Sequence, residues 1–186
     1  MSTVIARKRY TVTDYYRMVP AGIIHRDERV ELLDGEVRVK SPIGSWHSGV
    51  VMRLHSMLAK NLGDTVIISD QGPVRLGEYD EPEPDLAVLR PRDDFYTRSH
   101  PVPADVLLII EVADSSLDYD RDEKLPRYAA AGIPEVWLID IAGEAIEKFC
   151  ELRDGIYQIQ HVATGTEQVR PQLLPQFDVT AAELFA

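Results

Sequence analysis

The chain has 186 residues, 45% of them hydrophobic, and a formal net charge of −11. This length and composition fit one globular domain with a substantial core, and no apolar run reaches the ~18 residues that a membrane-spanning helix needs. The acidic balance argues against a general nucleic-acid-binding protein, which carries a basic face, although carboxylates that bind a metal ion add negative charge of their own.

The cysteine content and the first residues bear on the compartment. Cys150 is the single cysteine, so no intrachain disulfide can form, and the protein fits a reducing environment. Residues 1–10 carry three cationic side chains but no apolar segment of signal-peptide length. We therefore expect a cytoplasmic protein.

The first 46 residues predict a helix and a hairpin, which together form an N-terminal extension (1–46). Thr11 and Asp14 suit the first turn of a helix that ends at Met18. The dipeptide Asp34-Gly35 is favoured in tight turns. It separates two short strand-like segments, at 29–33 and 37–39.

Residues 47–140 alternate helical and strand patterns and form the expected core of the domain. Apolar residues recur at helical spacing over 48–62, and Gly63 ends that helix. The run 106–112 is the most hydrophobic in the chain and predicts a central strand that is buried on both faces. The other elements expected here are strands at 66–69, 74–76, 85–89 and 134–139, a loop at 93–103 and a helix at 118–131.

Residues 141–186 predict a C-terminal hairpin and a tail. The segments 144–151 and 157–161 flank the turn signal Arg153-Asp154-Gly155, and residues 180–185 fit one helical turn. The order of elements predicts an α/β (α+β) fold, in which helices flank a mixed central sheet that carries added β-hairpins.

Two carboxylates stand at the ends of neighbouring strand candidates. Asp85 follows Pro84, which fixes the entry to its strand, and Glu111 ends the most buried strand. Taken alone, each is more often a strand-end group that faces water. A carboxylate next to a buried strand needs a partner, however, because an unpaired buried charge is costly. Mg²⁺ binds one or two carboxylates and keeps several waters, so the pair favours a metal site.

A third group of polar residues lies on the following helix. Asp120, Lys124 and Tyr128 recur every fourth residue and therefore share one helix face. For the pair Asp120 and Lys124 alone, the plainer interpretation is a surface ion pair worth ~0.3–0.5 kcal/mol. The position of the helix changes that balance, because it directly follows the strand of Glu111 and its first turns must pass near the end of that strand.

These residues belong to an ordered set of motifs that spans most of the chain. The motifs are Glu31-Leu32-Leu33-Asp34-Gly35-Glu36, His47, Glu83-Pro84-Asp85-Leu86, Ile110-Glu111-Val112, Tyr119-Asp120 to Lys124 and Tyr128, and Glu135-Val136-Trp137-Leu138-Ile139-Asp140. The set resembles the PD-(D/E)XK nuclease superfamily and, within it, the Uma-two family of restriction endonucleases. No single motif is specific, but their order is.

The resemblance implies a set of catalytic residues. Asp85 and Glu111 would be the metal ligands, together with the carbonyl of Val112, and the ion would be Mg²⁺ or Mn²⁺. The superfamily usually places its lysine two residues after the acidic strand residue, where this chain has Ala113. The Uma-two pattern moves the lysine to the next helix, so Lys124 would take its role.

The resemblance also implies supporting residues around this centre. Glu31 resembles the extra acidic residue that some superfamily members supply from an N-terminal element. His47 opens the first long helix near the same cleft, although a lone histidine is more often structural. Asp120 would hold the lysine in place, and Tyr128 shares its helix face.

These expectations combine into a Mg²⁺-dependent endodeoxyribonuclease that hydrolyses phosphodiester bonds in DNA. A homodimer is expected for cutting two strands, with the C-terminal hairpin and the region of Trp137 as candidate contact surfaces. Two alternatives stay open. One is a nuclease-fold binding or regulatory module without turnover, which Ala113 and the acidic charge favour. The other is an interaction protein of a mobile-element or toxin–antitoxin system.

Overall fold

The computed structural model describes residues 7–186, so the first six residues of the expected N-terminal extension lie outside it. The α-helices are α1 (Val12–Met18), α2 (Ser45–Leu62), α3 (Leu117–Tyr119), α4 (Leu125–Ala131) and α5 (Ala181–Phe185). Short 3₁₀ turns cover Gly63–Thr65 and Pro103–Asp105, and a π-helix, η3, covers Asp120–Lys124. The strands are β1 (Val30–Leu33), β2 (Glu36–Val39), β3 (Ile67–Asp70), β4 (Leu86–Leu89), β5 (Val106–Ala113), β6 (Val136–Asp140), β7 (Ala145–Arg153), β8 (Ile156–Thr164), β9 (Gln168–Val169) and β10 (Val179–Thr180).

Six strands form one mixed sheet in the order β3-β4-β5-β6-β7-β8. Only β5 and β6 run parallel, and every other neighbouring pair is antiparallel. Strand β5 lies inside the sheet and is buried along its whole length, as its uninterrupted apolar run predicts. The expected mixed central sheet flanked by helices is confirmed.

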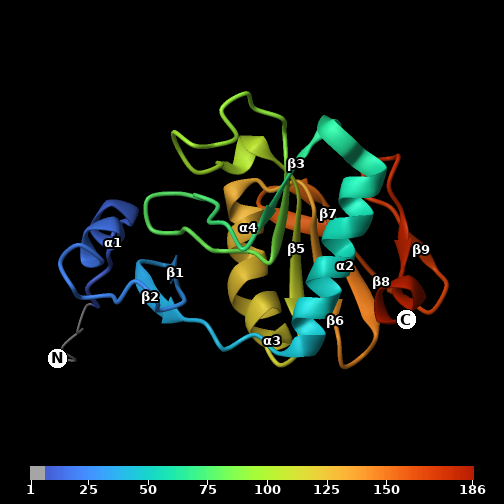
Figure 1. The fold of residues 1–186 in the computed structure, drawn as a ribbon, viewed down its shortest axis with the longest axis horizontal. Helices are drawn as coiled ribbons and strands as arrows, with labels where there is room; N and C mark the ends of the chain where they lie inside the picture. Colours follow the sequence, from blue (N-terminus) through green and yellow to red (C-terminus); the bar gives the residue numbers. More distant parts are fainter. Residues whose placement is uncertain (1–6) are drawn as a thin grey trace.

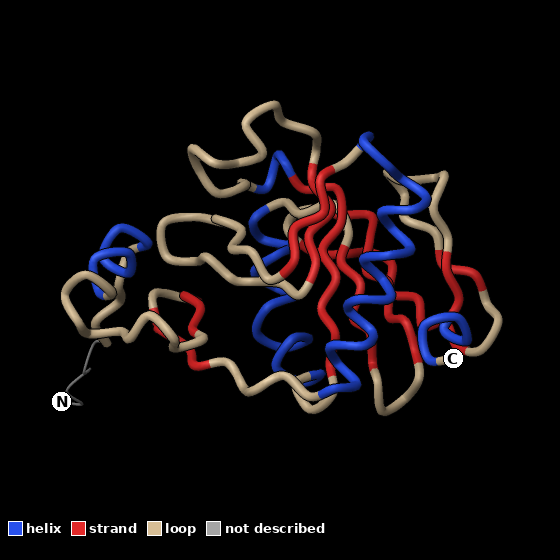
Figure 2. The backbone as a smooth tube through the Cα atoms, viewed as in Figure 1, coloured by secondary structure: helices blue, strands red, loops and turns tan. Residues whose placement is uncertain are grey.

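The helices cover both faces of this sheet because side chains alternate along each strand. Leu108 and Ile110 of β5 pack in the cluster that contains Leu54 and Leu58 of α2. Ile109, the residue between them, packs in the other cluster with Tyr128 of α4. The two figures of the whole chain show α2 crossing one face of the sheet and α4 lying behind it (Figures 1 and 2).

The hairpin β1–β2 and helix α1 lie beside the main sheet, at the N-terminal end of the molecule (Figure 1). The predicted turn is confirmed: Gly35 has a φ of 71°, a left-handed conformation that glycine adopts easily. An isolated bridge between Leu32 and Glu81 attaches the hairpin to the loop that leads into β4. The hairpin is therefore fixed next to the start of that strand.

The strand expected at 74–76 is wrong, because these residues form part of a loop that closes on itself. The Val74 N–H donates to the Pro82 carbonyl at 2.9 Å, and the Leu76 N–H donates to the Asp80 carbonyl at 3.0 Å. The Val74 side chain is fully buried against the α4 face of the sheet. Its apolar character thus reflects core packing rather than a place in the sheet.

The helix expected at 118–131 is interrupted by the π-helix, which separates α3 from α4. The Leu125 N–H reaches the Asp120 carbonyl, the i to i+5 bond of a π turn. Pro126 gives the physical reason. It has no N–H, and its ring would clash with the carbonyl four residues earlier, at Asp122. A wider turn immediately before the proline relieves that clash.

The C-terminal hairpin β7–β8 is confirmed and forms one side of the sheet. Trp137 is fully buried in β6, with its ring 6.3 Å from that of Phe177. The Trp137 side chain itself therefore cannot touch a second subunit, while the contact expected from its region stays a prediction. Within residues 7–186, no helix combines the length and apolar character needed to span a membrane.

Candidate active site

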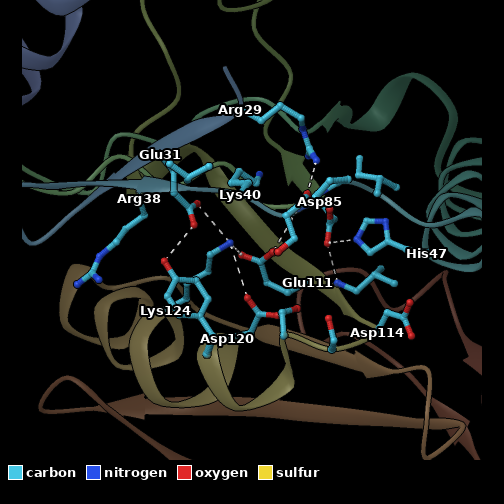
Figure 3. Close-up of a pocket in the computed structure, with 18 of the residues that line it drawn as sticks. Arg29, Glu31, Arg38, Lys40, His47, Asp85, Glu111, Asp114, Asp120 and Lys124 are labelled. Atoms are coloured by element: carbon cyan, nitrogen blue, oxygen red, sulfur yellow. Dashed lines mark hydrogen bonds and ion pairs between the residues drawn. The ribbon is translucent and has the colours of Figure 1, made fainter. Parts of the chain in front are cut away.

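A cavity of about 570 Å³ opens at the end of β5, where the strand meets α3. The hairpin β1–β2 forms one wall, and the first turn of α2 forms another. Figure 3 shows Glu31, Glu111 and Asp120 pointing toward Lys124. Several chain segments that are far apart in sequence therefore meet at one point.

Asp85 lies at the start of β4, next to the last residues of β5. The backbone pairing of β4 with β5 ends with Leu86 opposite Ile110. Beyond that point the Asp85 side chain, rather than the backbone, provides the hydrogen-bond acceptor for β5. Its Oδ2 accepts the Val112 N–H at 2.9 Å and lies 3.0 Å from His47 Nε2. Burial would raise the pKa of Asp85, but these hydrogen bonds hold it below its usual value.

Glu111 points to the α4 face of the sheet and is almost fully buried. Its Oε1 accepts the Tyr128 hydroxyl at 2.6 Å and lies 3.1 Å from Lys124 Nζ. Its Oε2 accepts the Asp85 backbone N–H at 3.4 Å, which ties Glu111 to the start of β4. Burial raises the pKa of Glu111 to about 8, although the Lys124 ammonium group opposes that shift.

Lys124 stands at the end of the π-helix and is 4% exposed. Besides Glu111, its Nζ lies 3.3 Å from Glu31 Oε2 and 3.7 Å from Asp120 Oδ1. Burial alone would lower the pKa of Lys124, but these carboxylates raise it above its ordinary range. The interpretation of Asp120 and Lys124 as a surface ion pair is therefore wrong. Both side chains are buried, and they belong to a cluster with Glu31 and Glu111.

Ala113 explains why the ammonium group comes from the helix. It lies two residues after Glu111, so its side chain projects to the same face of the sheet, and it is fully buried. The ammonium group near Glu111 instead belongs to Lys124 of the following helix.

Glu31 reaches the cluster from β1. Its Oε2 also accepts the Glu83 N–H at 3.1 Å, and its Oε1 lies 3.3 Å from the Tyr119 hydroxyl. Asp120 is held by the Ser116 hydroxyl, which donates to its Oδ2 at 2.7 Å. These contacts fix the carboxylates around Lys124.

The structure brings all the residues singled out in the sequence into one site, namely Glu31, His47, Asp85, Glu111, Val112, Asp120, Lys124 and Tyr128. It adds three cations of the β1–β2 hairpin that line the same cavity: Arg29, Arg38 and Lys40. Arg38 and Lys40 are two residues apart, which is the one pattern in the sequence that groups them. Arg38 lies in β2 opposite Glu31, and Lys40 directly follows that strand.

The donor set fits a hard divalent cation. Within residues 7–186, the second carboxylate oxygen of Asp85 accepts no hydrogen bond, and Asp85 lines the cavity. Val112 turns its N–H toward β4 and Asp85, and its carbonyl faces the same way because the N–H and C=O of one strand residue point to the same side. In this part of the chain, no three His, Cys, Asp or Glu side chains can hold a metal by themselves. Mg²⁺ needs only one or two carboxylates beside waters and substrate oxygens.

Comparison with known proteins agrees with this geometry. Residues 12–182 match the Uma2 family, described as "Putative restriction endonuclease". The fold matches a solved structure described as a "putative nuclease belonging to DUF820" from Anabaena variabilis, with a TM-score of 0.73 and 14% identity. The match covers 94% of this chain and 97% of that one. No curated protein matches the chain significantly. Since the family match spans nearly the whole sequence, the chain belongs to the Uma2 family.

Proposed function

We propose that this protein is a Mg²⁺- or Mn²⁺-dependent endodeoxyribonuclease that hydrolyses phosphodiester bonds in DNA. The observation that carries the proposal is the convergence of Asp85, Glu111 and Lys124, from two strands and a helix, at one cavity. Membership of a family described as "Putative restriction endonuclease" supports the same reaction class.

The roles follow from the contacts. Asp85, Glu111 and the carbonyl of Val112 would hold the ion. When bound, a divalent ion lowers the pKa of a water ligand and offsets charge on the phosphate. The Lys124 ammonium group, held by carboxylates on several sides, is positioned to hold the attacking water or a phosphate oxygen. Glu111 keeps that group in place with the hydrogen bond it accepts.

His47 and the hairpin cations would complete the site. His47 holds one oxygen of Asp85, which leaves the other oxygen directed to the ion. Arg29, Arg38 and Lys40 line the cavity and supply local positive charge in an acidic chain. Such side chains contact phosphate oxygens and position a DNA strand without reading its sequence.

The proposal includes a homodimer, because a symmetric pair of subunits can cut both strands of a duplex. The expected products are therefore nicked and linear forms of a circular plasmid. A monomer would produce nicks alone at low enzyme concentration.

The proposal is tested by incubating plasmid and single-stranded DNA with the purified protein and Mg²⁺ or Mn²⁺. We expect cleavage by the wild type and none after EDTA treatment. Asp85→Asn, which keeps the shape of the side chain and removes its charge, should be inactive while retaining the circular dichroism spectrum of the wild type. Equal cleavage by wild type and variant would reject the proposal.

Calorimetry separates the enzyme from the alternative of a binding module. The enzyme requires that Mg²⁺ or Mn²⁺ binds at millimolar concentration and that Asp85→Asn weakens this binding. DNA binding that is independent of the metal, with no cleavage, would instead support a nuclease-fold module without turnover.

A further inference from the structure

The two edges of the central sheet differ in length and charge. Strand β3, at one edge, has four residues and ends with Asp70. Strand β8, at the other edge, has nine residues and contains no Asp, Glu, Lys, Arg or Pro. Proteins usually protect an edge strand by making it short, charged or covered, and β8 is neither short nor charged.

The outer edge of β8 is also open. Within residues 7–186, one backbone hydrogen bond reaches this strand from outside the sheet, a turn contact from the Glu167 N–H to the Thr164 carbonyl. Ile156, Ile159 and Val162 expose 64%, 38% and 50% of their surface. The strand therefore presents unpaired backbone groups together with apolar side chains.

The sequence of β8 is symmetric about Ile159. Reading outward from it, Gln158 matches Gln160, an aromatic ring at Tyr157 matches the imidazole of His161, and Ile156 matches Val162. In an antiparallel pair, directly opposite residues lie on the same face. Over residues 156–162, two copies of β8 that meet at Ile159 would thus place apolar side chains opposite apolar ones, glutamine opposite glutamine and ring opposite ring.

We propose that β8 pairs antiparallel with β8 of a second copy of this chain, with a two-fold axis at Ile159. The pairing would join the two six-stranded sheets edge to edge. The charge of the chain favours this occupant, because two molecules that each carry −11 approach best along a strand without ionised carboxylates. This pairing specifies the contact surface of the homodimer proposed above. It rests on the proposed function only for its purpose, which is to bring two active sites together.

The test is the molar mass in solution, measured by light scattering after size exclusion, without metal or DNA. One copy has a mass of 21.0 kDa, and the wild type is expected at twice that value. In Ile159→Lys, two like charges would face each other across the axis, so we expect the mass of one copy. Ile23→Lys, a matched change at an exposed isoleucine in the loop after α1, should keep the dimer.

A charge-swap experiment tests the register. Ile159→Glu alone should also be a single copy, whereas mixing it with Ile159→Lys should restore the dimer, because opposite charges then meet. Val162→Lys provides a second disrupting variant if Ile159→Lys does not fold. A wild-type monomer, a dimer of Ile159→Lys, or a mixture that stays monomeric would each overturn the pairing. Because no cleavage is measured, a failed nuclease assay leaves this result unaffected.

Discussion

Two buried glutamates, one inside β5 and one just before β6, differ in what surrounds them. Glu135 precedes β6 and is 1% exposed, while Glu111 lies near the end of β5 and is 2% exposed. Each has a lysine nearby: Lys148 lies 3.4 Å from Glu135, and Lys124 lies 3.1 Å from Glu111. Burial and a neighbouring cation therefore do not distinguish a structural carboxylate from a functional one.

Hydrogen bonding does not separate the two residues. The Trp137 indole N–H at 2.7 Å and the Gln172 N–H at 2.8 Å donate to the two oxygens of Glu135, and both oxygens of Glu111 also have protein partners. Glu111 differs because it borders a cavity and shares its lysine with further carboxylates. An excess of negative charge beside open space marks a place where a cation can bind. Glu135 lacks both properties and links β6 to the C-terminal segment.

The largest expected effect separates the two glutamates by activity. Glu111→Gln should lower DNA cleavage by roughly 10³-fold, the scale seen when one preorganised electrostatic group is removed from an active site. Glu135→Gln should leave cleavage per folded molecule unchanged, and destabilise the protein by about 1–3 kcal/mol because donors lose a buried partner. Plasmid cleavage and urea denaturation measure the two quantities. Equal loss of cleavage in both variants would remove the distinction.

A smaller effect concerns the excess charge around Lys124. Lys124→Met leaves three carboxylates without their shared cation, and breaking a buried ion pair destabilises a protein by about 3–5 kcal/mol. A divalent ion can replace part of the lost positive charge. We therefore expect Mg²⁺ to raise the melting temperature of Lys124→Met more than that of the wild type.

Thermal denaturation with EDTA and with Mg²⁺ measures this gain. Lys148→Met, beside Glu135, is the matched control and should show no added response to Mg²⁺. An equal Mg²⁺ response in the wild type and in Lys124→Met would show that the cluster does not attract the ion.

A third expected effect is the pH dependence of stability, which affects folding rather than cleavage. Burial raises the pKa of Glu111 from 4.5 to about 8, so the folded protein holds this proton more tightly than the unfolded chain. The stabilisation is complete below pH 4.5 and is lost as the pH rises through about 8. Glu111→Gln cannot titrate. Its stability relative to the wild type, measured by urea denaturation in EDTA, should therefore increase over that interval. A constant difference would contradict the raised pKa.

Much of the fold is readable from local sequence. The uninterrupted apolar run of β5 and the Asp34-Gly35 turn each identify their element without reference to the rest of the chain. Val74 misleads because an apolar residue can enter the core from a loop as well as from a strand. The one local signal for the π-helix is Pro126. The spacing of apolar residues predicts a continuous helix here and gives no sign of the wider turn.

The site itself is harder to predict, because it depends on contacts between distant segments. Nothing in the sequence around Glu31 shows that its hairpin folds against the start of β4. The contact between Glu31 and Glu83 joins residues that are 52 positions apart in the chain. The strand-end positions of Asp85 and Glu111 favour a metal site, but the role of Lys124 rests on the family resemblance, and the spacing of the three residues along the chain does not require them to meet. The hairpin cations could be recognised as site residues only after the hairpin was placed.

The wide turn at Asp120–Lys124 has a consequence for how such a centre can change. An ammonium group needs only enough reach to end beside Glu111, and either a strand position or a helix position can provide it. The π turn adds one residue ahead of α4 without altering the pairing of the sheet. The two metal ligands that we propose thus stand at the sheet, whereas the proposed cation belongs to a separate helical segment.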